Sequence, residues 1–216
     1  YLNHSAMLTS LVIALCPSDE PEAVTGYGRA NYRCNVGMSP HPLFYADDRG
    51  EDGPYYFRLA QLRSADIADG LSTTAGISER LRGDWTIDRF KAGGDVRFAD
   101  IDFAVRRSAD ADSTLRYCRE ANAANATAYS MGGESWAMSG LSFTSYNHCA
   151  APNHIEESCG FLTPPPTMEV RITMLGSFPA TSRHPGGVNV LMMDGAVKFA
   201  RDSVSLPVWR AVSTHN

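Results

Sequence analysis

The sequence predicts an α+β fold with an antiparallel β-sheet, a C-terminal β-hairpin, few short helices and long loops stapled by disulfides. Three observations predict it. Short β-forming stretches alternate with turn-forming residues, an Asp-Gly pair at 194–195 separates two strand-like stretches, and five cysteines lie among loop-rich segments. We expect one globular domain over residues 1–216, because a chain of this length can bury a sizeable core.

The composition is that of an ordinary globular protein, with 44% hydrophobic and 20% charged residues and a net charge of −5. The basic residues are scattered along the chain, which argues against nucleic acid as a partner, since phosphate binding needs a concentrated positive face. No run of 18 apolar residues occurs, so we expect no transmembrane helix within the chain.

Five segments have the composition of strands. They are residues 8–16, 31–37, 73–79, 95–107 and 168–175. The first is an apolar run that ends before Pro17, and the third follows an Asp-Gly turn at 69–70 and has Ala75 and Ile77 on one face. In the fourth, the alternation slips near Ala99, which indicates a β-bulge.

A helix is predicted over residues 113–124, where Asp112 serves as the N-cap and Leu115 and Cys118 face inward. Residues 130–167 are rich in Gly, Ser, Asn and Pro, so we expect a long irregular region there.

The C-terminal hairpin is the strongest local prediction. Asp194-Gly195 favours a two-residue type I′ turn, which pairs Met193 with Ala196 and Val190 with Phe199. The predicted apolar face consists of Val188, Val190, Met192, Val197 and Phe199. After the hairpin, Ser205 is expected to cap a short helix with Pro207 in its first turn and Trp209 packing back.

His184 precedes Asp194 by one strand length, so at about 3.4 Å per residue the two lie roughly 30 Å apart. They cannot form a catalytic dyad. We expect His184 to be a strand-entry residue bonded to a neighbouring loop, and the alternative is a ligand or metal role.

Together with this spacing, other segments carry a family resemblance. They are "LCPSD" at 15–19, "NYRCNVG" at 31–37, "DGLSTTAGISERLRGD" at 69–84, "ESWAMSG" at 134–140, "YNHCAAPN" at 146–153 and "DSVSLPVWRAVST" at 202–214. The chain resembles the prepilin-like family named for its H-x9-DG motif. The matching motif residues are His184, Gly186, Gly187, Asn189, Asp194 and Gly195.

The resemblance implies a pilin-like head domain, exported to the cell surface, periplasm or extracellular space. Such a protein contributes to a surface filament, a secretion apparatus or an envelope complex. Its partners are proteins, including copies of itself, and it touches a membrane only through an N-terminal helix that this chain lacks. The resemblance supplies no catalytic residues, and we expect no enzyme activity.

The cysteines contain no CxxC pair, which argues against a zinc site or a redox motif. Buried free thiols are one reading. The favoured reading is an exported domain in which Cys16 pairs with Cys34 and Cys118 with Cys159, leaving Cys149 unpaired.

Enzyme motifs are absent: there is no G-x-S-x-G, P-loop, H-E-x-x-H or G-x-G-x-x-G. The runner-up function is an extracellular glycan- or protein-binding module that uses the 130–167 region, with Glu134, Trp136 and Tyr146 as candidate contacts. No cofactor is expected apart from Ca²⁺. An acidic loop offers four carboxylates for this ion, from Asp47, Asp48, Glu51 and Asp52, and its alternative role is a solvated turn. His148 and His154, close to Cys149, are a weaker metal candidate.

Overall fold

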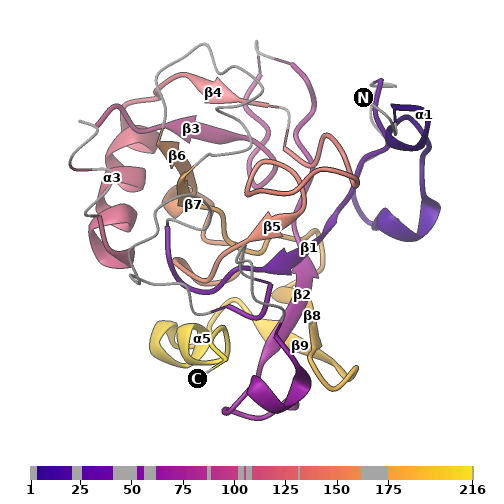
Figure 1. Cartoon of the computed structure of the whole chain (residues 1–216). Coiled ribbons are helices and arrows are strands. Elements are labelled where there is room, and N and C mark those ends of the chain that lie inside the picture. The colour runs from indigo at the N-terminus through magenta and orange to yellow at the C-terminus, as the bar shows by residue number, and fades with distance from the viewer. Residues whose placement is uncertain are drawn as a thin grey trace.

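The computed structural model describes residues 4–20, 26–40, 53–55, 62–86, 89–101, 105, 109–130, 132–161 and 175–215 (Figure 1). The helices are α1 (His4–Met7), α3 (Ala111–Ala123) and α5 (Leu206–Ala211), with 3-10 turns η1 (Val12–Ala14), η2 (Ser64–Asp66) and η3 (Ile155–Glu157). The strands are β1 (Tyr32–Asn35), β2 (Ala75–Glu79), β3 (Val96–Phe98), β4 (Ala128–Tyr129), β5 (Ser145–Tyr146), β6 (Cys159–Phe161), β7 (Leu175–Ser177), β8 (Gly187–Met192) and β9 (Val197–Arg201). Among these residues, no helix combines the length and the apolar character that a bilayer crossing requires.

The described strands form two sheets, which confirms the α+β class. One has the order β5-β1-β2-β8-β9 and the other β4-β3-β6-β7. Most neighbours are antiparallel, but β1 pairs with β5 and β3 pairs with β6 in parallel. The predicted antiparallel pairing therefore holds for most of the described pairs, and two parallel pairs were not predicted. Both parallel partners come from the 130–167 region, where strands of two or three residues are too short to show an alternating pattern.

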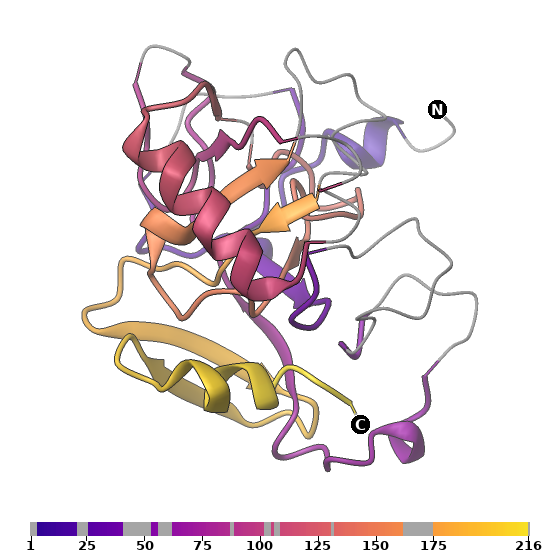
Figure 2. The same cartoon turned by 90° about the vertical axis from the view of Figure 1, so that its left-hand side faces the viewer.

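Helix α3 lies beside the four-stranded sheet, with Leu115 and Cys118 buried as predicted (Figure 2). Its N-cap is Asp110, two residues before the predicted cap. The Asp110 side chain accepts a hydrogen bond from the Ser113 amide, and the Ser113 hydroxyl bonds back to the Asp110 backbone. Because of this reciprocal capping box, the helix begins at Ala111, two residues before the predicted start.

Helix α5 lies along the hairpin, as Figure 2 shows. Ser205 occupies the N-cap position, Pro207 lies in the first turn, and Trp209 packs against buried Val188 and Val190. The helix, the place of Pro207 and the packing of Trp209 are confirmed, whereas the Ser205 side chain makes no capping hydrogen bond.

The segment 8–16 is not a strand. It contains the 3-10 turn η1, in which Val12 and Ile13 are 84% and 86% exposed. An apolar run becomes a buried strand only where a sheet edge accepts it. Here the segment meets the residue before β1 through a hydrogen bond from the Asn31 N–H to the Ala14 carbonyl, and it does not continue as a paired strand.

The strand predicted over 95–107 is much shorter, since β3 ends at Phe98, just before the expected bulge. The strand predicted over 168–175 lies outside the described residues except for Leu175, which begins β7.

The hairpin is present, but its predicted register is wrong by one residue. Leu191 pairs with Val197 and Asn189 with Phe199. Of the turn pair, only Gly195 has a positive φ (+90°), whereas a type I′ turn needs positive φ at both positions. The loop therefore holds one more residue than predicted.

A slip of one residue moves every side chain of a strand to the opposite face. Val188, Val190 and Met192 of β8 are buried as expected, but Val197 and Phe199 of β9 point away from them and are 66% and 49% exposed. The hairpin thus has an apolar outer face as well as a core face.

Candidate functional site

His184 lies beside Glu79, the last residue of β2. The imidazole Nε2 is 3.1 Å from Glu79 Oε1. Asn189 of β8 donates its backbone N–H to Glu79 Oε2 at 3.0 Å and its side-chain amide to Oε1 at 3.1 Å. The Glu79 carboxylate is only 3% exposed, so these bonds replace the water it has lost. They hold the entry of β8 against the end of β2, so the carboxylate partner of His184 comes from a strand.

Cys16 completes a cluster with these two residues. Its Sγ is 3.8 Å from His184 Nε2, and its backbone N–H donates to Asn31 Oδ1 at 3.0 Å. One ligand atom from each of Cys16, Glu79 and His184 lies within 4.8 Å of the others. Tyr32 borders the cluster, since it pairs with Glu79 across the sheet. Burial and the neighbouring Cys16 and Glu79 raise the pKa of its phenol.

The predicted Cys16–Cys34 disulfide is wrong, because both residues are free thiols. Cys16 lies beside the Tyr32–Glu79 pair of the sheet. Cys34 lies two residues further along β1, where it pairs with Ile77. Two residues of strand span about 7 Å, which separates Cys16 from Cys34 along the sheet and places it against His184 instead.

The cluster is not arranged as a Cys-His-acid triad. In a triad the nucleophile contacts one imidazole nitrogen and the orienting carboxylate the other. Here Cys16 and Glu79 both approach Nε2. The geometry suits three groups converging on one point.

The remaining motif residues shape the hairpin. Gly186 has φ +82°, and a Cβ on Gly187 would lie 2.1 Å from the Ala200 carbonyl and 2.8 Å from the Phe199 ring. Asp194 Oδ1 accepts a hydrogen bond from the Ala196 N–H, which closes the turn beside Gly195.

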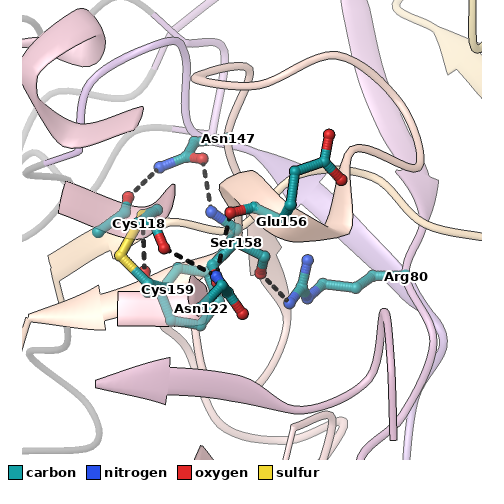
Figure 3. The surroundings of a disulfide bond; sticks show 9 residues. Arg80, Cys118, Asn122, Asn147, Glu156, Ser158 and Cys159 are labelled. Carbon is teal, nitrogen blue, oxygen red and sulfur yellow. Dashed lines mark hydrogen bonds between the residues drawn. A yellow bond between two sulfur atoms is a disulfide. The ribbon is translucent and has the colours of Figure 1, made fainter. Parts of the chain in front are cut away.

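The Cys118–Cys159 disulfide is present as predicted and joins α3 to β6 (Figure 3). Asn122 reinforces the junction, since its side-chain amide donates to the backbone oxygens of Cys118 and Ser158. The Arg80 guanidinium donates to Ser158 Oγ from the opposite side. Cys149 remains a thiol, which donates to the Met38 carbonyl.

The three candidate glycan contacts do not form a surface. Glu134 and Tyr146 are buried, and the Trp136 indole donates to the Thr9 carbonyl at 2.8 Å. The candidate calcium ligands Asp47, Asp48, Glu51 and Asp52 lie outside the described residues.

The weaker metal candidate of His148, His154 and Cys149 does not form either. His148 is buried, stacks on Trp209 at 3.9 Å between ring centroids, and bonds to the Trp209 carbonyl through Nδ1. Burial lowers its pKa to about 3 although this bond opposes the shift. His154 instead faces Glu157.

A buried ionic network lies next to the cluster and was not anticipated from the sequence. Asp19 accepts bonds from Asn31, Arg82 and Lys91, and these outweigh the effect of burial, so its pKa is lowered. Asp95 lies beside Lys91 and accepts its backbone N–H, yet burial raises the Asp95 pKa to about 7.

The observed register of the hairpin gives the protein a second surface feature. Strand β9 is the last of the described strands on its side of the five-stranded sheet, and it carries the exposed Val197 and Phe199. Between β9 and α5 lies a cavity of about 230 Å³, whose apolar walls include Val190, Ala200 and the exposed Val208.

A family model described as "Protein of unknown function (DUF1559)" matches residues 2–206 of the chain. Neither the curated proteins nor the solved structures contain a match.

Proposed function

We propose that this chain, which belongs to the DUF1559 family of proteins of unknown function, is a non-enzymatic structural protein that resembles the exported head of a pilin or pseudopilin. In this proposal it contributes to a surface filament, a secretion apparatus or an envelope complex at the cell surface, in the periplasm or outside the cell. Its partners are protein subunits, including further copies of itself.

The observation that carries the proposal is the outer face of the β8–β9 hairpin. A strand at a sheet edge offers unpaired N–H and C=O groups to another chain, and proteins usually protect such edges with charge or with a covering element. Strand β9 carries the charged Lys198 and Arg201, yet it also exposes the apolar side chains of Val197 and Phe199. An apolar edge strand suits addition of a strand from a neighbouring subunit.

The chemistry of the H-x9-DG motif also favours a structural role. His184 and Asn189 bond to Glu79, Gly187 makes room for Ala200 and Phe199, and Asp194 closes the turn. These residues build and orient the hairpin that presents the apolar face.

The Cys118–Cys159 disulfide supports export, because disulfides persist in oxidising compartments. The runner-up reading, a glycan- or protein-binding module, gains no support from its three candidate contacts, since two of them are buried.

The experiment compares two variants of the full-length gene product in cells of the native host. Phe199→Glu places a charge on the β9 face, and Ile13→Glu places the same charge on an exposed apolar residue of η1. Fractionation and immunogold electron microscopy should find the wild type and Ile13→Glu outside the cytoplasmic membrane in assemblies of high mass. Phe199→Glu should remain exported but dispersed. A wild-type product found as a free cytoplasmic monomer would refute the proposal.

A further inference from the structure

We infer that Cys16, Glu79 and His184 bind one divalent transition-metal ion of the zinc type. The three residues offer a thiolate sulfur, a carboxylate oxygen and an imidazole nitrogen, the three donor types that zinc takes in proteins. This site is separate from the β9 face and does not depend on the proposed function.

The two distances from His184 Nε2 to the other donor atoms are close to those around a tetrahedral ion. With metal bonds of about 2.0 Å to nitrogen and oxygen and about 2.3 Å to sulfur, tetrahedral geometry requires N···O of about 3.3 Å and N···S of about 3.5 Å. The observed separations from His184 Nε2 are 3.1 Å to Glu79 Oε1 and 3.8 Å to Cys16 Sγ. These two separations lie within about 0.3 Å of the tetrahedral values, and the sulfur and the carboxylate oxygen lie within 4.8 Å of each other.

The convergence on one imidazole nitrogen is what separates this site from a simple hydrogen-bonded pair. A single Nε2 proton serves the Glu79 oxygen and leaves the thiol 3.8 Å away without a strong bond to the ring. An ion placed between the three atoms contacts all of them at once.

Two of the three donor residues are already held in place by a neighbour, as ligands are by outer residues in metal sites. Asn189 bonds to both oxygens of Glu79, and Asn31 accepts the backbone N–H of Cys16. Cys16 and Glu79 are buried, while the His184 side chain is 30% exposed and lies at the open side. That side provides an entry path and a fourth position for water.

The donor set selects the class of ion. Ca²⁺ and Mg²⁺ require oxygen ligands, whereas one thiolate and one imidazole favour Zn²⁺ and its neighbours in the first transition series. On binding, the Cys16 S–H bond breaks, its proton passes to solvent, and a metal–sulfur bond forms. The Nε2 proton of His184 also passes to solvent as Nε2 binds the metal, and Nδ1 takes one up from solvent, so that the ring stays neutral.

The test is a titration with Co²⁺ of the folded full chain, with the Cys118–Cys159 disulfide intact and Cys16 as a thiol; Co²⁺ reports a bound thiolate through a charge-transfer absorption band. We expect one equivalent of Co²⁺ to produce the band and Zn²⁺ to abolish it by displacement. In Cys16→Ser the band should be absent, and Zn²⁺ affinity, measured by competition with a chromophoric chelator, should fall at least about tenfold.

Cys34→Ser is the matched control, because Cys34 is also a free thiol but lies outside the cluster. It should retain both the band and the wild-type Zn²⁺ affinity. Circular dichroism establishes that each variant is folded, and Zn²⁺ should raise the melting temperature of the wild type and of Cys34→Ser but not of Cys16→Ser. Folded wild-type protein without the band, a band that survives in Cys16→Ser, or one lost in Cys34→Ser would overturn the assignment.

Discussion

His184 Nε2 lies 3.1 Å from Glu79 Oε1, so the motif histidine is bonded to strand β2 while the motif aspartate closes the hairpin turn at the other end of β8. The nine-residue spacing between His184 and Asp194 is therefore the length of one strand with its entry and its turn. Each end of the motif fixes a different part of the same hairpin.

Glu79→Gln should lower the free energy of unfolding by about 1–3 kcal/mol. The carboxylate accepts both Asn189 bonds, and replacing one oxygen by an NH₂ group places a donor against a donor. Urea denaturation measures the change. Glu156→Gln, at an exposed glutamate of η3, should stay within about 0.5 kcal/mol of the wild type. Equal effects at the two positions would contradict the role of Glu79.

Three glycine-to-alanine substitutions should form a graded series. Gly26→Ala should change stability little, because its added methyl meets nothing within 4 Å. Gly186→Ala should cost about 1 kcal/mol, since its φ of +82° strains any residue with a Cβ. Gly187→Ala should cost about 2 kcal/mol or more, because its methyl would meet the Ala200 carbonyl. Thermal melts rank the variants by their melting temperatures. If Gly187→Ala lowered the melting temperature no more than Gly26→Ala, the close contact between Gly187 and Ala200 would be wrong.

Replacing the disulfide by Cys118→Ala/Cys159→Ala should destabilise the fold by about 4 kcal/mol, the chain-entropy value for a loop of 41 residues. Peptide mapping of native protein without reductant should find this one crosslink and thiols at Cys16, Cys34 and Cys149. A crosslink between Cys16 and Cys34 would contradict the structure and remove a ligand from the proposed metal site.

Asp95 should make the fold less stable as pH rises from about 4 to about 7. Its pKa is 3.8 ordinarily and about 7 in the folded protein, so the folded chain retains a proton that the unfolded chain has released. The stabilisation is complete below pH 3.8 and is lost through pH 7. Asp95→Asn should therefore reduce the fall in melting temperature between pH 5 and pH 8.

Asp66→Asn is the control for this titration, because hydrogen bonds from Arg63 lower the pKa of Asp66 and keep its titration below this range. It should leave the slope between pH 5 and pH 8 at the wild-type value. A slope unaffected by Asp95→Asn would show that Asp95 does not retain a proton in the folded state.

Local chemistry allowed several elements to be predicted from the sequence. Ser205 and Pro207 predicted α5, and the stretches of β-forming residues around Cys34 and Ile77 predicted β1 and β2. The hairpin register was missed because Asp-Gly is compatible both with a type I′ turn and with a longer loop in which only the glycine has positive φ. That choice decides which face Val197 and Phe199 occupy.

The cluster around His184 was missed for a different reason. Glu79 lies 105 residues and Cys16 168 residues before His184 in the chain. No local spacing connects them, and only the pairing of β2 with β8 brings Glu79 to the strand entry. A disulfide with Cys34 would occupy the Cys16 sulfur, whereas in the structure Cys16 is a thiol that faces the imidazole.

The central claim is that β9 contacts a neighbouring protein subunit through its apolar face. Photo-crosslinking in native cells tests it most directly, with a photoreactive amino acid placed at Phe199 in one strain and at Ile13 in a control strain. Mass spectrometry of the products should identify a specific crosslink from position 199 to another copy of this chain or to a second envelope protein, and none from position 13. If position 199 yields no crosslink above the position 13 background, β9 is not an assembly face.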